Sequence, residues 1–318
     1  MAPTTHVIGR GIVGRRLVRM LADRPVIQHD GRWTAVGGTA PGDVAVVAHG
    51  GDHIDRTVAL LDRGVHVVTV GDSLADTIEL LDLKPADGLT LVVGAAMSPG
   101  LSGLVARHLA DQLATVDEIH IAVHGTAGPA CARAHHRSLS GLSPSWRDGA
   151  WVDDVGGSGR ELCWFPEPIG GKDCYRARIS SPLTIHRSFP EVARISARRS
   201  ARRRDRLTAW LPMLSAPHPE GGVGGLRVEV RGADESGGRQ ARVVGVAELV
   251  GTAAAATAAA FATAIADGLI PPGTWVSGSI DLPTVELLRR VERFGVRLQE
   301  FTGIPNQPRQ PSTPGGVV

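Results

Sequence analysis

The stretch that decides the fold lies near the N-terminus and reads His6-Val7-Ile8-Gly9-Arg10-Gly11-Ile12-Val13-Gly14. A short apolar run leads into three glycines with the spacing G-x-G-x-x-G, and residues with helical periodicity follow. In this context the first glycine permits a tight turn and the second lets a pyrophosphate approach the backbone. The third lets the helix pack closely on the strand. The stretch therefore predicts a dinucleotide-binding domain of the Rossmann type.

Working outward, strand-like and helix-like segments alternate as far as residue 115. Apolar runs at 43–49, 65–70 and 89–93 are expected strands, and the segments at 54–63 and 74–83 are expected helices. This alternation predicts a parallel sheet covered by helices on both faces. The interval between a second short strand, which ends at Asp30, and the strand from Asp43 has no room for further helices and strands. We therefore expect the adenine side of the domain to be abbreviated.

The alternation of expected strands and helices ends after residue 115. Short strands separated by Gly-rich turns predict an α+β second domain at 116–250 with a mainly antiparallel sheet. A C-terminal segment at 251–304 begins with an Ala-rich helix, and the Pro- and Gly-rich tail at 305–318 is expected to be disordered. The predicted fold class is therefore α/β, with an abbreviated Rossmann-type sheet followed by an α+β domain.

Composition limits the class of protein. The 318 residues are 42% hydrophobic and 21% charged, with a formal net charge of +2, so the chain has no general attraction to nucleic acid or membranes. Three cysteines fit no metal pattern, and together with the polar N-terminus they favour a cytoplasmic protein with reduced thiols. The apolar run at 243–266 is mostly Ala, Thr and Gly, which favours a buried helix over a membrane span. The basic run at 194–206 is interpreted as a solvated face or a wall that attracts an anionic substrate.

The cofactor site is expected beyond the carboxyl ends of the parallel strands. Asp30 lies about 20 residues past the glycines, where an acidic residue can bind the ribose hydroxyls of NAD, although it could also be an ordinary turn residue. Nearby arginines such as Arg10 and Arg32 could instead face a 2′-phosphate, so NAD and NADP both stay open. The candidate cofactor-binding residues are Gly9, Arg10, Gly11, Ile12, Val13, Gly14, Asp30, His49, Gly50, Gly51, Asp72, Ser98, Pro99 and Gly100.

Four segments give the chain a resemblance to the saccharopine dehydrogenase-like family, which also contains homospermidine and carboxynorspermidine synthase relatives. They are the glycine-rich stretch at 7–14 and the segments at 64–73, 94–102 and 251–273. Within the third, Met97-Ser98-Pro99-Gly100 resembles that family's Asp-Pro-Gly loop near the nicotinamide, with Ser98 in place of Asp. The resemblance implies a C-terminal helix that returns to the Rossmann domain. It also implies NAD(P)-linked oxidation or reduction at a carbon–nitrogen bond of an amino-acid-like substrate.

Candidate catalytic residues lie in the second domain. His124, His135 and His136 could relay a proton because an imidazole titrates near neutrality, and Tyr175 is the only tyrosine. Each could instead be an exposed or packing residue without a catalytic part. Candidate clamps for a substrate carboxylate are Arg133, Arg147 and Arg176. No metal is expected, and a homodimer through the second sheet is a hypothesis. The rival interpretation is a non-catalytic dinucleotide sensor or a degenerate Rossmann scaffold.

Overall fold

The computed structural model describes residues 2–31, 38–51 and 53–301. The tail expected to be disordered, and Arg32, lie outside the described residues. The N-terminal domain is built on a six-stranded sheet with the order β14-β5-β4-β3-β1-β2, in which every pair is parallel. Its strands are β1 (Thr5–Ile8), β2 (Val26–His29), β3 (Val44–Val47), β4 (His66–Thr69), β5 (Thr90–Val92) and β14 (Gly273–Trp275).

Helices cover both faces of this sheet, as the alternation predicts. Side chains alternate between faces along a strand, so Ala45 and Val47 pack with α2 (Ile54–Leu61) and α3 (Leu74–Asp82). Val44 and Val46 pack with residues of α1 (Ile12–Met20) and the Ala-rich helix. The strands of the sheet centre are therefore buried on both sides, which accounts for their continuous apolar runs.

The adenine side is abbreviated, as expected. The chain enters β2 directly from α1 and then crosses to β3, which lies on the other side of β1. Among the described residues no strand lies outside β2. The central strand β3 is buried throughout, whereas β2 is only partly buried and exposes Ile27. The crossover from β2 to β3 marks the switch point at which such sheets bind ligands.

The second domain is a large mixed sheet with the order β15-β13-β12-β6-β11-β10-β9, and β7 and β8 extend from β11. Only β6 and β11 are parallel, so the prediction of a mainly antiparallel sheet is confirmed. Its strands are β6 (Thr115–His124), β7 (Leu142–Arg147), β8 (Ala150–Val155), β9 (Glu161–Phe165), β10 (Gly170–Arg176), β11 (Arg194–Ser200), β12 (Val223–Ala233), β13 (Arg239–Leu249) and β15 (Gln299–Glu300). Its remaining helices are α4 (Leu101–Ala110), α5 (Pro129–Ser138), α6 (Ser181–Ser188), α7 (Arg203–Leu207) and α9 (Thr284–Arg293).

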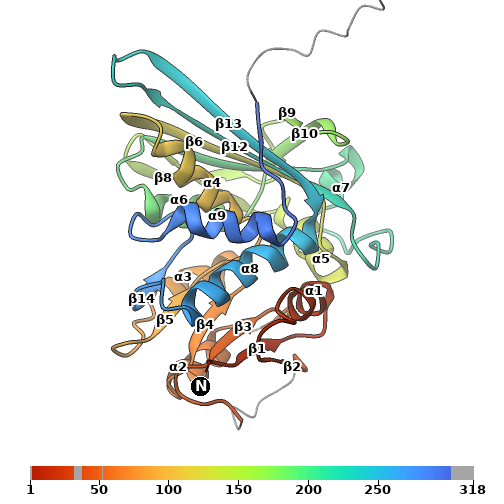
Figure 1. Ribbon diagram of the computed structural model, residues 1–318. Helices are drawn as coiled ribbons and strands as arrows, with labels where there is room; N and C mark the ends of the chain where they lie inside the picture. The colour runs from red at the N-terminus through yellow and green to blue at the C-terminus, as the bar shows by residue number, and fades with distance from the viewer. Residues whose placement is uncertain (1, 32–37, 52, 302–318) are drawn as a thin grey trace, which may run out of the picture.

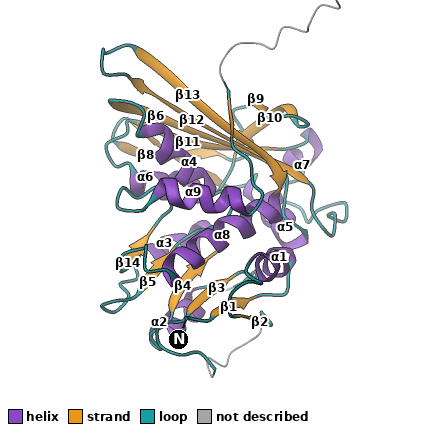
Figure 2. Cartoon of the chain, viewed as in Figure 1, coloured by secondary structure: helices purple, strands orange, loops and turns teal. Residues whose placement is uncertain are grey.

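Helix α8 (Val250–Ala266) joins the two domains. It lies between the two sheets (Figures 1 and 2), where it contacts β3 and β4 of one and β12 and β13 of the other. A helix packed on several sides must be apolar all round, and small alanine side chains let both sheets approach closely. The apolar run at 243–266 is thus the end of β13 followed by this buried helix, and the expected return to the Rossmann domain is confirmed.

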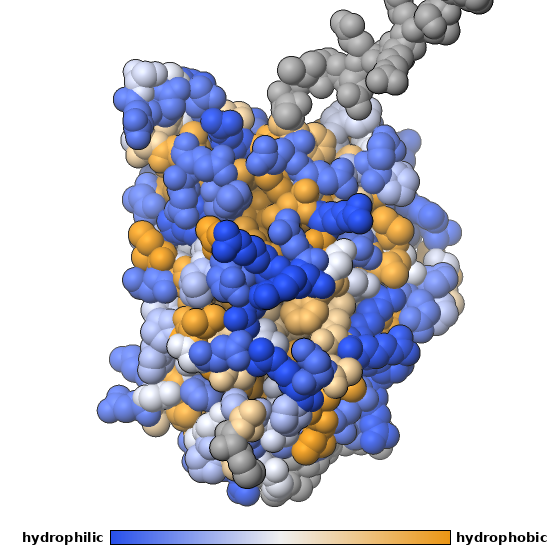
Figure 3. Space-filling view, viewed as in Figure 1, coloured by the Kyte–Doolittle hydropathy of each residue, from blue (hydrophilic) through white to orange (hydrophobic). Residues whose placement is uncertain are grey.

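Hydrophilic residues cover most of the face turned to the viewer in Figure 3, with hydrophobic residues between them. Within the described part of the chain, no helix combines the length and the apolar character needed to cross a membrane.

Candidate active site

The three fingerprint glycines have different neighbours. A Cβ on Gly9 would lie 2.4 Å from the Ala48 carbonyl oxygen, and one on Gly14 would lie 2.1 Å from the Gly9 oxygen. The protein itself therefore requires glycine at these two positions. A Cβ on Gly11 would meet no atom of residues 2–31, 38–51 or 53–301 within 4 Å. Gly11 caps α1 at its N-terminus, so the space above it faces the unpaired N–H groups of that helix, which attract a phosphate.

Other loops at the same edge of the sheet converge on this turn. A Cβ on Gly31, just beyond the exposed Asp30 at the end of β2, would lie 3.2 Å from the Cβ of His49 after β3. Gly51 follows His49 in the next turn. The candidate adenosine-binding residues are thus brought together by the ends of β1, β2 and β3.

Helix α5 links this crevice to the second domain. A Cβ on Gly128 would lie 2.4 Å from Cδ1 of Ile12, and a Cβ on Gly50 would lie 3.6 Å from that of Ala130. The N-terminus of α5 therefore packs against the fingerprint turn and the loop after β3. Its last turns, which carry His135 and His136, reach a large cavity further along the edge of the sheet.

This cavity, of about 820 Å³, lies between the domains. The loop after β4 and the start of α3 form one wall, from Asp72 to Ala75. The second domain forms the other walls with α5, the end of β10, β11 and the segment Ala209–Met213. Its volume lies in the range of about 300–1,000 Å³ typical of small-molecule sites. Its place at the carboxyl end of β4 is where the nicotinamide end of a dinucleotide would point.

A buried polar cluster lies beside the cavity. Asp72 Oδ2 is 3.7 Å from His135 Nε2, and that same nitrogen is 3.2 Å from Cys131 Sγ. Burial, followed by the positive charge of Arg199, lowers the pKa of His135 to about 4, although Asp72 acts in the opposite direction. Burial and the negative charge of Asp72 raise the pKa of Cys131 to about 11. At neutral pH the imidazole and the thiol are therefore both uncharged.

The loop after β5 also contacts the second domain. Ser98 Oγ lies 2.8 Å from Ser181 Oγ at the start of α6, and Ser180 Oγ donates a hydrogen bond to the backbone oxygen of Asp72. Gly100 has a φ of +126°, and a Cβ there would lie 2.1 Å from the Ala96 oxygen. The loop is therefore tightly turned and held against α6 near the cavity.

The other candidate catalytic residues make no contact within the cluster of Asp72, His135 and Cys131. His136 Nε2 lies 3.0 Å from the backbone oxygens of both Thr208 and Leu211, so it donates to the segment that forms a cavity wall. Tyr175 is buried in the core, opposite Arg199 in the neighbouring strand. His124 is hydrogen-bonded to Ser200 Oγ at 2.6 Å, on the sheet face opposite to that of Arg199. Only His135 is thus brought to the buried cluster.

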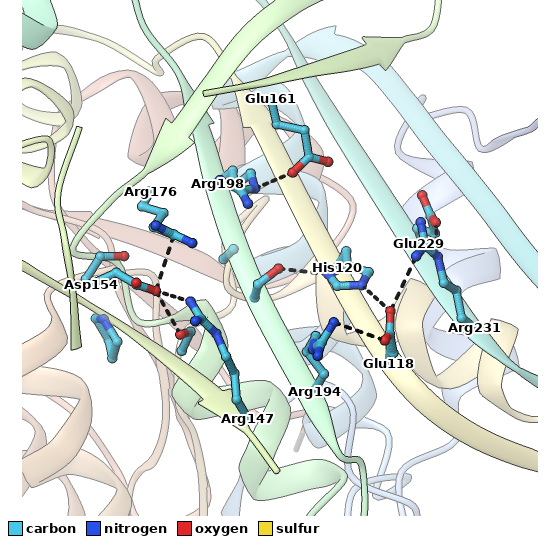
Figure 4. A pocket seen from close by; sticks show the side chains of 15 residues that line it. Glu118, His120, Arg147, Asp154, Glu161, Arg176, Arg194, Arg198, Glu229 and Arg231 are labelled. Carbon is cyan, nitrogen blue, oxygen red and sulfur yellow. Dashed lines mark hydrogen bonds and ion pairs between the residues drawn. The ribbon is translucent and has the colours of Figure 1, made fainter. Parts of the chain in front are cut away.

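Two of the candidate substrate arginines lie in a different pocket. Arg147 and Arg176 both form ion pairs with Asp154, in a pocket of about 370 Å³ on the outer face of the second sheet (Figure 4). Arg133, by contrast, lines the interdomain cavity. A role in substrate binding therefore remains a prediction for all three, with only Arg133 close to the cofactor edge.

Sequence reasoning missed Arg199 and Cys131. The basic run at 194–206 contains β11, a strand inside the sheet, in which Ile195, Ala197 and Arg199 are buried and the residues between them are not. The alternation of buried and less buried residues along this strand could have identified Arg199 as buried. Arginines occur on both faces of the strand, however, and make the alternation hard to recognise in the sequence. Among the described residues no group of three or more His, Cys, Asp or Glu side chains could hold a metal ion.

No protein-family model matches the chain, and no curated protein matches it. Among solved structures, apo saccharopine dehydrogenase (L-Glu forming) from Saccharomyces cerevisiae matches with a TM-score of 0.67 and 13% identity, over 94% of this chain and 99% of that one. Amine dehydrogenase from Mycobacterium smegmatis has a TM-score of 0.46 and 14% identity, over 87% of this chain and 95% of that one. A meso-dapdh mutant from Clostridium tetani E88 has a TM-score of 0.45 and 10% identity, over 89% and 95%. Of these three likenesses only the first is strong enough to define a fold, and by it this chain has the fold of saccharopine dehydrogenase.

Proposed function

We propose that the chain is an NAD(P)-dependent oxidoreductase that acts on a small substrate at a carbon–nitrogen bond, as an imine or amine of an amino-acid-like molecule. One observation carries the proposal: no atom of the described residues fills the space above Gly11 at the N-terminus of α1, although the glycines on either side of it are enclosed by protein atoms. A glycine that no protein contact requires is explained if a pyrophosphate must approach the backbone there.

The residues around the crevice would divide the binding of the cofactor between them. The turn from Gly9 to Gly14 would hold the pyrophosphate, and Asp30 would accept hydrogen bonds from ribose hydroxyls. The loop from Ser98 to Gly100 would lie beside the nicotinamide. When bound, the cofactor supplies or accepts the hydride. Whether the chain prefers NAD or NADP depends on the balance between Asp30 and the nearby arginines.

The interdomain cavity would hold the substrate next to the nicotinamide. His136 lines this cavity, and the adjoining His135 is the candidate proton-transfer residue that contacts Asp72. Its neutral imidazole can accept a proton from the substrate nitrogen or donate a hydrogen bond to it, while Asp72 holds the ring in place. The enclosing walls would exclude water from the reacting atoms.

The alternative function is a non-catalytic dinucleotide sensor. The low pKa of His135 and the high pKa of Cys131 favour it, because neither group exchanges protons readily near neutral pH. Saturable cofactor binding without turnover of any imine or amine would support the sensor.

The proposal includes a cytoplasmic homodimer formed through the second sheet. Leu162 and Trp164 of the edge strand β9 are 58% and 59% exposed, and such side chains favour association when they gather on one face. Sedimentation at several protein concentrations tests this part of the proposal, and the substitution Trp164→Ser should weaken the dimer.

The first experiment is a titration of the purified protein with NADH and, separately, with NADPH, followed by nicotinamide fluorescence. Saturable binding in the micromolar range supports the oxidoreductase and identifies the cofactor. The protein should then be screened with imines and amino acids for turnover. If neither dinucleotide binds, the proposal is wrong, and the domain with its abbreviated adenine side has lost the ability to bind the cofactor.

A further inference from the structure

Residues 208–222, here called the strap, connect the short helix α7 to β12 and lie at the right-hand edge of Figure 1, beside α5. The first part of the strap, Ala209–Met213, forms a wall of the interdomain cavity. Its last part reaches the fingerprint turn, since a Cβ on Gly128 would lie 3.6 Å from the Pro219 oxygen and 2.4 Å from Cδ1 of Ile12. The strap therefore runs along the crevice from the cavity to the N-terminus of α1.

Both ends of the strap are fixed. At the first end, Nε2 of the buried His136 lies 3.0 Å from the backbone oxygens of Thr208 and Leu211. At the second end, a Cβ on Gly221 would lie 2.3 Å from the Thr126 oxygen, so the backbone there packs closely against the loop before α5. The strap can therefore move only as a flap held at its two ends.

Between these ends the strap is scarcely packed. Among the described residues, no backbone hydrogen bond joins residues 212–220 to another element of the fold. The middle is held by a hydrogen bond from Arg204 Nη2 to Ser215 Oγ, and Ala209 is the one buried residue of the strap. Segments with few buried contacts and few backbone hydrogen bonds open at a low cost in free energy.

Trp210 gives the strap a reason to change position. Its side chain is 76% exposed although it lines the cavity, and Leu214 further along the strap is 64% exposed. An aromatic side chain of this size gains free energy when it leaves water and packs against another surface. The cavity of about 820 Å³ beside it has the volume of a small-molecule site. A ligand in this cavity would offer the ring such a surface.

We propose that the strap is a lid that closes over the nicotinamide end of the crevice when a dinucleotide binds, and that closure buries Trp210. The ring packs better in the closed position once the ligand is present, so the ligand shifts the equilibrium toward closure. A closed strap excludes water from the reacting atoms and delays release of the cofactor. The inference rests on the proposed function, because it requires a dinucleotide in the crevice.

Hydrogen–deuterium exchange of the full chain, with and without saturating NADH or NADPH, tests the closure. We expect the dinucleotide to slow exchange of the amides of residues 211–222 about tenfold or more. The turn between β12 and β13, which lies at the far end of the second sheet in Figure 1, serves as the internal control and should exchange equally in both states. Nicotinamide fluorescence measures binding separately. Binding without slower exchange in the strap would overturn the lid and leave the oxidoreductase standing, whereas absence of binding would overturn both.

Two further measurements follow Trp210 itself. The difference in acrylamide quenching between the unmodified chain and Trp210→Phe reports this one side chain, and saturating oxidised dinucleotide should reduce that difference. Trp210→Ser should release NADH about threefold to tenfold faster in stopped-flow experiments, because the closed state loses its main apolar contact. The matched control is Ile280→Ser, which removes an apolar side chain that is 75% exposed outside the cavity and should leave the release rate unchanged. Equal quenching in both states, or equal release rates for Trp210→Ser and Ile280→Ser, would overturn the inference.

Discussion

Asp72 Oδ2 lies 3.7 Å from His135 Nε2, and this contact joins the loop after β4 of the parallel sheet to helix α5 of the second domain. Burial alone would raise the pKa of Asp72, but the contact with His135 and the positive charge of Arg199 lower it. Burial and Arg199 lower the pKa of His135 to about 4. The two side chains therefore meet at neutral pH as a carboxylate and a neutral imidazole.

The first prediction concerns stability below neutral pH. Unfolded histidine binds a proton below its ordinary pKa of 6.5, whereas folded His135 does so only below about 4. Between these values the unfolded state holds more protons, so stability falls as the pH falls. For His135 this loss is about 2 kcal/mol between about pH 7.5 and pH 5. His135→Asn should remove that part of the loss.

Urea unfolding of both proteins at several pH values measures this difference. Other histidines, such as His66 and His124, also have lowered pKa values and contribute to the pH dependence of both proteins. The diagnostic quantity is therefore the difference between the two curves. Curves that run parallel from neutral pH to pH 5 would contradict the assignment of a low pKa to His135.

Much of the N-terminal domain follows from local sequence patterns. The glycine spacing, the continuous apolar runs and the short interval after Asp30 each depend on neighbours in the sequence, and they predict the strands, their burial and the abbreviated adenine side. The strand β14 is absent from the prediction because the three residues Gly273–Trp275 are too few to show a period. They form a strand only because β5 offers an unpaired edge.

The candidate site is less predictable because pairings distant in sequence assemble it. Arg199 is buried because β11 lies between β6 and β10, and no local pattern states which strands will flank it. In the sequence Arg147 and Arg176 have the same chemistry as Arg133. In the structure, however, they lie on the outer face of the sheet, where both form ion pairs with Asp154. Residue type predicts the chemistry, whereas the strand order determines which residues meet.

The second prediction distinguishes the fingerprint glycines. Gly11→Ala should lower NADH affinity about tenfold or more, since the methyl group would occupy the space needed by the pyrophosphate. The same change should cost no more than about 1 kcal/mol of stability, because a Cβ there meets no protein atom and only the N-cap preference is affected. Fluorescence titration and urea unfolding measure the two effects.

Two variants serve as controls for Gly11→Ala. Gly14→Ala should destabilise the fold by about 1–3 kcal/mol or more, since its Cβ would lie 2.1 Å from the Gly9 oxygen. Gly222→Ala also places a Cβ in open space, outside the fingerprint, and should change neither property. If Gly11→Ala bound NADH as tightly as Gly222→Ala does, the cofactor would not lie over the fingerprint turn.

The third prediction concerns the choice of dinucleotide. Asp30 is exposed at the end of β2, where its carboxylate would meet the ribose of the adenosine half. A carboxylate there repels a 2′-phosphate, so Asp30→Ala should shift the ratio of NADPH to NADH affinity about tenfold toward NADPH. The ratio is diagnostic whichever dinucleotide the unmodified chain prefers. An unchanged ratio would place the adenosine ribose away from β2.

The last prediction contrasts the two buried arginines. Arg107 donates to the backbone oxygens of Gly278 and Ser188, and its guanidinium carbon lies 3.9 Å from the centre of the Phe189 ring. It thereby ties α4 to α6 and to the segment before α9. Arg107→Met leaves two buried carbonyl groups without donors, so it should lower the free energy of unfolding by about 2–4 kcal/mol. Arg199→Met leaves no such groups and loses only the attraction between Arg199 and Asp72, so it should cost less than Arg107→Met. Urea unfolding of both variants measures these changes, with the exposed Arg289→Met as the control. Equal losses in the free energy of unfolding for Arg107→Met and Arg199→Met would mean that both arginines are structural and that the charge of Arg199 is satisfied within the protein.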